Sequence, residues 1–381
     1  MRAGLLLGVL SIVAYSEELP PGRIIDDVKC SADPSQTYAL YLPSHYSANR
    51  AWAVIFALDP GARGRLPVTR FQPGAENYGY IVAGSNNSRN GSWEMSLAAV
   101  QAMVAEVTQR FAIDRKQMYL AGFSGGARVA MQVALSTSQI AGVIASSAGF
   151  PDSTPRKSVP FAIFATAGTE DFNYLEMRRL DRALTTPHHL AIFEGGHGWP
   201  PSNLAEEAIE WLETQAMKSG RRPSDQAILD GAFARRVAQA NSQTSEFATT
   251  RAVQALIDDF EGLRDVTKFA ARVAALQRNK SVKQAGKKEL ELEQREEHFL
   301  IDLVALEAQL ANPAARNASL SSLRSRLADL THQANAAEDS SERRLARRLL
   351  RGAIVRSIEL HKDPEYRRLL DELPIAGRPG G

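Results

Sequence analysis

Hydrophobic residues in the first part of the chain form short runs of strand length, separated by stretches long enough for helices. The runs are Ala51–Leu58, Tyr80–Ser85, Gln117–Phe123, Ile140–Ser146, Phe161–Ala167 and His189–Phe193. The stretches with helical character include Glu94–Gln109, Ala127–Ser136, Tyr174–Leu184 and Asn203–Met217. Runs that are apolar on both faces and alternate with helices are typical of central parallel strands joined by crossover helices. With an earlier pair, Arg23–Cys30 and Thr37–Leu42, that favours two antiparallel strands, the pattern predicts an α/β fold with a mostly parallel sheet.

The pattern changes after Ser219, where strand-like runs end and Ala, Leu, Arg, Glu and Gln dominate. Ser224-Asp225 is a typical helix start. Later helical stretches are Ser245–Leu263, Asp265–Leu276, Ser281–Leu310, Leu320–Ala336 and Ser341–His361. No fixed repeat period is found among them. We therefore expect a linker at 219–223, a smaller all-helical domain at 224–373 and a disordered tail at 374–381.

Composition limits the class of protein further. Apolar residues make up 44% and charged residues 23% of the 381 residues, and the formal net charge of +2 does not indicate a nucleic-acid partner. The single cysteine, Cys30, excludes an intramolecular disulfide and a thiolate metal cluster.

The first residues of the chain differ in composition from the rest. Arg2 and the apolar run 4–15 resemble a secretory signal peptide, with cleavage expected after Ser16, and the alternatives are an N-terminal core strand or a misplaced start. The run is too short to span a bilayer comfortably. The expectation is an exported protein, periplasmic or secreted, with no stable membrane span after cleavage and a catalytic domain at 17–218.

The sequence Gly122-Phe123-Ser124-Gly125-Gly126 lies directly after an apolar strand and directly before a helical stretch. In this context G-x-S-x-G predicts a sharp strand-to-helix turn that presents the serine hydroxyl above the carboxyl ends of the strands. The backbone N–H of Gly125, at the start of the helix, is placed to bind an oxyanion. The other interpretation is an ordinary glycine-rich turn. Ser124 is the candidate nucleophile.

A serine nucleophile needs a general base, and seven histidines are present. His197 alone follows the last predicted strand in a glycine-framed loop, Glu194–Pro200, and a structural histidine is the other interpretation. The base in turn needs a carboxylate to orient it. Asp171 follows the next-to-last strand, with Glu170 as the obvious rival and Asp152 as a weaker one. The order Ser, Asp, His is the order expected of an α/β-hydrolase.

These residues resemble the α/β-hydrolase superfamily over about 23–218. Within it the chain is similar to the polyhydroxybutyrate-depolymerase and feruloyl-esterase group and to the phospholipase/carboxylesterase group. The resemblance rests on Tyr41-Leu42-Pro43 with Tyr46, the turn around Ser124, Gly168–Asp171 and Gly195–Pro200. The loop that usually reads His-Gly in the family, and donates the other oxyanion N–H, here reads Leu58-Asp59-Pro60-Gly61-Ala62. Because Pro60 has no N–H, the resemblance implies Gly61 as that donor.

The polar loop after the Tyr80–Ser85 run is expected to border the same edge of the sheet. Asn87 and Trp93 are the candidate substrate contacts there, against an Asx-rich turn with Trp93 as a core anchor. Trp199 is either a pocket wall or a packing residue. No metal-binding or phosphate-binding motif is found, so no metal and no cofactor is expected.

The function expected from these residues is hydrolysis of a carboxylic ester through an acyl-enzyme, with a small-molecule or polymeric ester as substrate. Thioesters and peptides pass through the same kind of tetrahedral oxyanion, so a thioesterase or a serine peptidase is the nearest alternative. A non-catalytic scaffold that works through its helical domain is the alternative from another class. The helical domain itself could bind a protein partner, mediate self-association or cover the active site.

Overall fold

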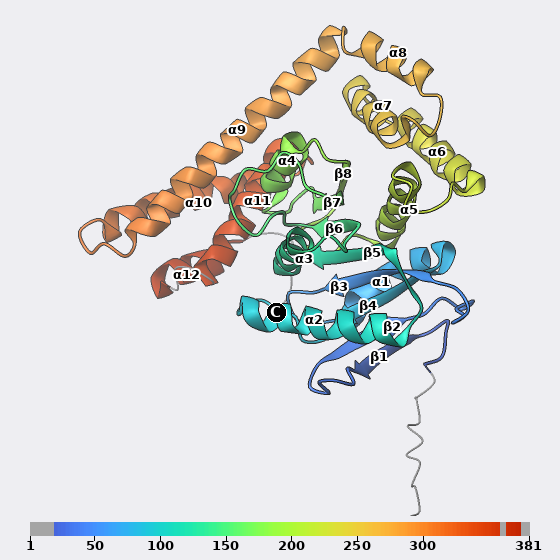
Figure 1. Cartoon of the computed structure of the whole chain (residues 1–381). Coiled ribbons are helices and arrows are strands. Elements are labelled where there is room, and N and C mark those ends of the chain that lie inside the picture. The colour runs from blue at the N-terminus through green and yellow to red at the C-terminus, as the bar shows by residue number, and fades with distance from the viewer. Residues whose placement is uncertain (1–18, 359–362, 375–381) are drawn as a thin grey trace, which may run out of the picture.

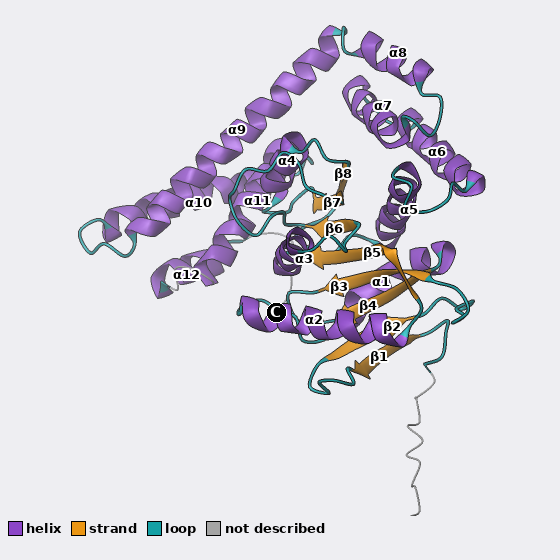
Figure 2. Cartoon of the chain, viewed as in Figure 1, coloured by secondary structure: helices purple, strands orange, loops and turns teal. Residues whose placement is uncertain are grey.

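A computed structural model of the chain describes residues 19–358 and 363–374, so the predicted signal segment 1–16 lies outside the described residues, as does the tail from 375 onward. An eight-stranded sheet, orange in Figure 2, organises the first part. Its strands are β1 (Ile24–Lys29), β2 (Thr37–Tyr41), β3 (Trp52–Leu58), β4 (Tyr80–Ser85), β5 (Ile113–Phe123), β6 (Gly142–Ser146), β7 (Ala162–Gly168) and β8 (His188–Phe193).

The strand order is β1-β2-β4-β3-β5-β6-β7-β8. The pairs β1–β2 and β2–β4 are antiparallel and all other pairs are parallel. The central strands β3, β4 and β6 are buried along their whole length, which is why their sequences are continuously apolar. This mostly parallel eight-stranded sheet confirms the α/β fold class predicted from the sequence.

Helices cover both faces of the sheet. The bounds are α1 (Arg65–Tyr78), α2 (Trp93–Arg110), α3 (Gly125–Ser136), α4 (Tyr174–Ala183) and α5 (Ser202–Lys218). One core joins the sheet to α2, α3 and α4, and a second core joins it to α1 and α5. The parallel strands therefore end at one common edge, where the loops that carry the candidate site begin.

The second half is helical throughout its described residues. Its helices are α6 (Gln226–Asn241), α7 (Glu246–Phe260), α8 (Thr267–Leu276), α9 (Lys280–Gln309), α10 (Arg316–Ala334), α11 (Ser341–Arg356) and α12 (Pro364–Asp371). Several begin at a residue whose side chain accepts a hydrogen bond from the first turn, as Asp225, Ser245, Ser340 and Asp363 do. Figure 1 shows that α6–α8 lie on one side of the β5–β8 end of the sheet, and that α9 crosses to α10–α12 on the other.

Buried charges connect the two halves. The indole N–H of Trp211 on α5 donates to Asp259 Oδ1 on α7 at 2.6 Å, and His189 and Arg236 lie within ion-pair distance of the same carboxylate. Burial opposes the ionisation of Asp259, but these neighbours outweigh it and keep its pKa below its usual value. On the other side, Arg178 of α4 pairs with Glu293 of α9. The helical half is thus packed against the sheet part at two separate places.

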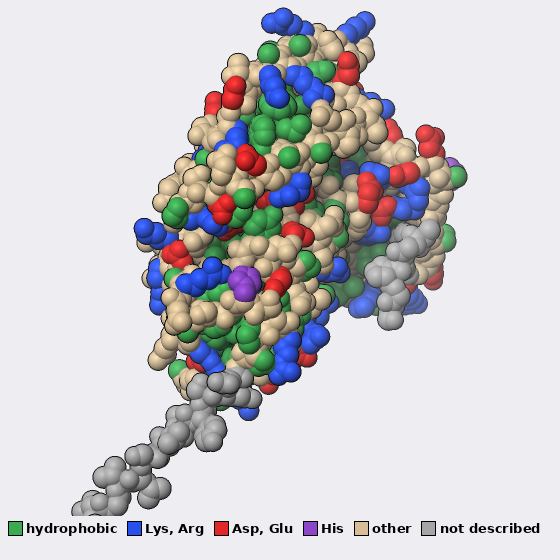
Figure 3. All heavy atoms as spheres, turned by 90° about the vertical axis from the view of Figure 1, so that its right-hand side faces the viewer, with side chains coloured by type: hydrophobic (Ala, Val, Ile, Leu, Met, Phe, Trp, Pro, Cys, Tyr) green, Lys and Arg blue, Asp and Glu red, His purple; other side chains and the backbone are tan. Residues whose placement is uncertain are grey.

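The surface carries mixed charge. On the face in Figure 3, Lys and Arg side chains are interspersed with Asp and Glu and do not gather into one basic patch. Within residues 19–358 and 363–374, no helix combines the length and apolar character needed to cross a membrane. The same residues hold no cluster of three or more His, Cys, Asp or Glu side chains suited to a metal ion.

Candidate active site

Ser124 lies on the sharp turn between β5 and α3. Its backbone has φ 53° and ψ −121°, a conformation that costs a non-glycine residue energy and that is typical of a nucleophile elbow. The Ser124 N–H donates to Ser146 O of the neighbouring strand β6 at 2.9 Å, which fixes the turn against the sheet.

The glycines of the pentapeptide are required by close backbone approach. A Cβ at Gly122 would lie 2.3 Å from the carbonyl oxygen of Gly126, and a Cβ at Gly126 would lie 2.1 Å from the carbonyl oxygen of Leu58. Neither space admits a side chain, because the neighbouring atoms belong to the backbone. The G-x-S-x-G spacing is therefore set by the packing of the turn onto β3 and α3.

His197 lies between Ser124 and a carboxylate and is within hydrogen-bond distance of both. Its Nε2 lies 2.9 Å from Ser124 Oγ, and its Nδ1 lies 2.8 Å from Asp171 Oδ1. The three residues follow β5, β7 and β8, so the structure brings together residues that are 73 and 26 positions apart in the sequence. These distances are those of a nucleophile, a general base and a carboxylate that orients the base.

The imidazole is held by its surroundings as well as by the carboxylate. The ring of Phe172 stacks on it with a centroid distance of 4.0 Å, and the ring of Phe123 lies 4.7 Å away. Asp171 is fully buried, and its Oδ1 also accepts from the N–H of Asn173 at 2.8 Å. The side chains that would move in catalysis are thus restrained in one arrangement.

The two rival carboxylates lie elsewhere. Glu170 turns away from His197 and contacts Arg347 and Arg351 of α11. Asp152 is exposed and pairs with Arg156, whose side-chain hydrogen bond is the main reason that the pKa of Asp152 lies below its ordinary value. Asp171 is therefore the carboxylate that the structure places on the histidine.

The two predicted oxyanion donors have different outcomes. Gly125 is the first residue of α3 and lines the pocket beside Ser124. The N–H of Gly61 instead donates to Asp59 Oδ1 at 2.8 Å, and Gly61 is not among the residues that line the pocket. The assignment of Gly61 as a donor is wrong, because the carboxylate of Asp59 accepts that N–H.

Asn90 occupies the region next to the Gly125 backbone. Its Oδ1 lies 1.8 Å from the position that a Cβ on Gly125 would take, so its side-chain amide lies directly over the first turn of α3. The Asn90 N–H donates to Pro60 O at 2.9 Å, and Gly61 forms a β-bridge with Arg89. The loop after β4 is therefore fixed to the loop after β3, and this contact holds the Asn90 amide beside the Gly125 backbone.

Two of the three predicted substrate contacts prove to be structural. Asn87 accepts from the N–H of Thr37 at 2.8 Å and donates to Ser35 O at 3.1 Å, so it joins two loops away from the pocket. Trp199 is buried against Phe71 and Phe123, and its indole N–H donates to Asp59 Oδ2 at 2.8 Å. Both predicted contacts are therefore wrong.

Trp93 is the predicted contact that does lie at the pocket. It is the first residue of α2, is 45% exposed, and lines the mouth of the pocket. The start of α2 does not require a tryptophan at this position, because the side chain of Ser92 caps the helix. An exposed tryptophan beside a catalytic-type serine fits a substrate contact.

The pocket above Ser124 has a volume of about 730 Å³, and one of its walls comes from the helical half. Leu300 and Val304 of α9 and Leu349 and Val355 of α11 supply apolar residues of this wall. Three of the four arginines in this lining form ion pairs: Arg128 with Glu176, Arg348 with Glu296, and Arg356 with Glu307. The fourth, Arg89, is exposed, so the lining offers apolar surface, compensated charge and one further guanidinium group.

Sequence reasoning gave a helical domain that covers the active site only as one of three alternatives, and it missed Phe172 and Asn90. Phe172 directly follows Asp171, but an aromatic next to a carboxylate carries no signal of its own. Asn90 belongs to the polar loop that was expected at the site, where several Asn and Ser residues were equally eligible. Nothing in the sequence connects α9 and α11 to Ser124, because their approach depends on how two separately patterned halves pack.

No protein-family model matches the chain, and no curated protein matches its sequence. Solved structures with a similar fold include an esterase from Pyrobaculum calidifontis, with 11% identity over 52% of this chain and 87% of that chain and a TM-score of 0.41. They include Est1E from Butyrivibrio proteoclasticus, with 12% identity over 50% and 98% of the two chains and a TM-score of 0.40. A feruloyl esterase module from Clostridium thermocellum matches with 14% identity over 50% and 86% and a TM-score of 0.39.

Proposed function

We propose that the protein is a serine hydrolase that cleaves a carboxylic ester through an acyl-enzyme. The single observation that carries the proposal is the hydrogen-bonded series from Ser124 Oγ to His197 to the buried carboxylate of Asp171. His197 takes the proton of Ser124 as Oγ attacks the carbonyl carbon, and returns it to the leaving alkoxide. Water then enters by the same route and releases the acid, which restores the serine.

Reaction with a fluorophosphonate probe tests this proposal. The probe forms a stable bond only with a serine whose hydroxyl is activated by a base. We expect one adduct per chain, mapped to the peptide that contains Ser124. Unreacted protein with an intact near-ultraviolet circular dichroism spectrum would contradict the proposal, and the scaffold alternative would then take its place.

Two hydrogen-bond donors are proposed for the negatively charged oxygen of the tetrahedral intermediate. The first is the backbone N–H of Gly125, which belongs to the four N–H groups at the start of α3 without an acceptor inside the helix. The second is the side-chain amide of Asn90, whose oxygen and nitrogen exchange places by rotation about one bond. The amide replaces the N–H that Gly61 gives to Asp59.

Replacing Asn90 with alanine tests the second donor. We expect kcat to fall by about 100-fold, as removal of one oxyanion donor typically does, with a much smaller change in KM. Asn90→Asp, which keeps the shape and loses the donor, is expected to fall at least as far. The matched control is Asn87→Ala in the same loop, because Asn87 contacts Thr37 and Ser35 and not the pocket. Full activity of both Asn90 variants would rule out this role.

The pocket favours an uncharged, apolar acyl group. Three of the four arginines that line it pair with carboxylates, and the fourth, Arg89, is exposed. Trp93 and Val304 leave apolar surface exposed at its mouth. Each buried methylene contributes about 0.8 kcal/mol to binding. We therefore expect kcat/KM to rise by at least about 10-fold from the 4-nitrophenyl acetate to the octanoate ester.

A pair of substitutions on α9 separates this pocket effect from a general one. Val304 lines the pocket and is 39% exposed, whereas Leu290 is 51% exposed on the same helix and does not line it. Val304→Gln is expected to lower the preference for octanoate several-fold, and Leu290→Gln to leave it unchanged. Equal hydrolysis of acetate and octanoate by the wild type would contradict the assignment.

Three further expectations stay proposals. Ester is proposed as the acyl donor in preference to thioester or peptide, and parallel assays with a thioester and a peptide of the same acyl group decide the point. Export rests on the apolar run 4–15 of the sequence. Self-association or partner binding through the helical half rests on its apolar positions, and light scattering of the purified protein tests the former.

A further inference from the structure

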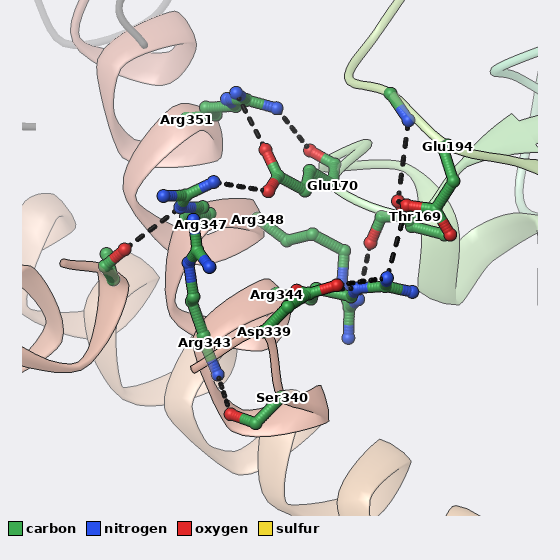
Figure 4. Close-up of polar contacts among 12 residues, drawn as sticks. Thr169, Glu170, Glu194, Asp339, Ser340, Arg343, Arg344, Arg347, Arg348 and Arg351 are labelled. Atoms are coloured by element: carbon green, nitrogen blue, oxygen red, sulfur yellow. Dashed lines mark hydrogen bonds and ion pairs between the residues drawn. The ribbon is translucent and has the colours of Figure 1, made fainter. Parts of the chain in front are cut away.

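Helix α11 directs a row of arginines at the loops that carry the triad acid and base. Arg344, Arg347, Arg348 and Arg351 recur at spacings of three and four, so they share one face of the helix. Figure 4 shows these side chains reaching from α11 toward Thr169, Glu170 and Glu194. The contacted residues directly precede Asp171 or begin the His197 loop.

Glu170 is the centre of these contacts. Arg347 Nη1 lies 2.6 Å from Glu170 Oε1, and Arg351 Nη2 lies 2.9 Å from Glu170 Oε2. Each carboxylate oxygen therefore meets a separate guanidinium group, and all three side chains are less than a quarter exposed. Charge-assisted contacts of this kind are strong when they are shielded from water.

Two arginines also hold the backbone of the same loop. Arg348 Nη1 donates to the carbonyl oxygen of Thr169 at 2.8 Å, and Arg351 Nη1 donates to that of Glu170 at 3.1 Å. Arg348 is itself nearly buried, paired with Glu296 of α9 and placed 4.4 Å from the ring centroid of Tyr174. The Arg348 side chain that binds the Thr169 carbonyl is therefore itself held in place.

The residue after Asp171 also contacts α11. A Cβ on Gly352 would lie 3.4 Å from Phe172 Cβ, so the helix backbone lies directly against Phe172. Phe172 in turn stacks on the His197 ring. A Cβ on Gly196, beside His197, would lie 2.6 Å from Arg351 Nη1. Helix α11 thus contacts the chain on both sides of Asp171 and next to His197.

We infer that α11 is a positioning element of the active site. The ion pairs of Glu170 with Arg347 and Arg351 hold loop 169–173 in the place where Asp171 can orient His197. The inference rests on the proposed function, and it makes Glu170 a positioning residue. A misplacement of Asp171 by about 1 Å would cost about 100-fold in rate.

The experiment measures the second-order rate of fluorophosphonate reaction at Ser124 in the full chain. Glu170→Gln keeps the shape of the side chain and removes its charge. We expect it to lower the rate by about 10-fold in the wild-type background, a part of the loss that full misplacement causes. In the Asp171→Ala background the same substitution is expected to have no further effect, because there is no longer a carboxylate to position. Rates are normalised to the folded fraction.

A control and a second variant complete the design. Arg316→Gln removes ion pairs with Asp363 and Glu365 between α10 and α12, and is expected to leave the rate unchanged. If Glu170→Gln fails to fold, Arg351→Gln removes two contacts to Glu170 while Arg347 and Arg348 still anchor the loop, and its rate is expected to fall in the same way.

The outcomes separate the two proposals. An unchanged rate in Glu170→Gln, or the same loss in both backgrounds, would overturn the positioning role, since a merely structural residue lowers both alike. A wild-type protein that does not react at Ser124 would overturn the proposed function and the inference with it. A loss confined to the wild-type background, with Arg316→Gln unaffected, supports the inference.

Discussion

Replacing Ser124 with alanine is expected to remove ester hydrolysis, with kcat lower by about 10⁶-fold, as for other serine nucleophiles whose triad acts as a unit. The change deletes only Oγ, the atom that lies 2.9 Å from His197 Nε2. The backbone bond from Ser124 to Ser146 O does not depend on the side chain. The fold and the thermal unfolding temperature should therefore change little.

The measurement combines turnover of 4-nitrophenyl esters with intact mass after fluorophosphonate treatment. Ser136→Ala in the same helix is the control, because Ser136 Oγ bonds only to Val133 O and lies at the far end of α3. The control should form the adduct at the wild-type rate. Residual labelling of Ser124→Ala at another residue, together with wild-type turnover, would show that the nucleophile is not Ser124.

The sheet was the most predictable part of the fold. Strands such as β3 and β6 are apolar on both faces because they lie between two helix layers, and such runs need no tertiary knowledge to recognise. Helix α1 was not among the helices named from the sequence. Pro67 and Pro73 interrupt its pattern, yet it forms because Phe71 and its neighbours are buried against the sheet.

The residues of the proposed triad could be placed from local context, since each follows a predicted parallel strand and such strands end at a common edge. Details that depend on which hydrogen-bond partner a particular side chain finds could not be placed in this way. Asp59 takes the Gly61 N–H and the Trp199 indole, which removes one predicted donor and one predicted substrate contact. The helical wall of the pocket was equally inaccessible, because periodicity shows which face of α11 is polar and not that Glu170 lies opposite it.

Removing the helical half is expected to leave a folded protein whose serine reacts about 100-fold more slowly, as expected for a misplaced base. The hydrophobic clusters of the two halves do not mix. The two clusters on the sheet consist of residues between Val28 and Leu212. The two clusters of the helical half consist of residues between Ala232 and Leu370. That the boundary separates two domains stays a prediction, and this truncation tests it.

A chain that ends at Ser224 is the best choice for this test. It keeps Arg222, which pairs with the buried Glu213 of α5, and it stops before Asp225, the N-cap of α6. It loses Asp259, so Trp211 is left without its acceptor and the truncated protein should unfold at a lower temperature.

Two measurements separate loss of fold from loss of reactivity in the truncated chain. Near-ultraviolet circular dichroism reports on the buried Trp52 and Trp199, and the fluorophosphonate rate reports on Ser124. A native spectrum with a slow reaction is the expected result, because loop 169–173 has then lost Arg347, Arg348 and Arg351 together. A native spectrum with an undiminished rate would show that Asp171 needs no support from α11. An insoluble chain would show instead that the sheet requires the helices to fold, and that the boundary at 219–223 does not separate independent domains.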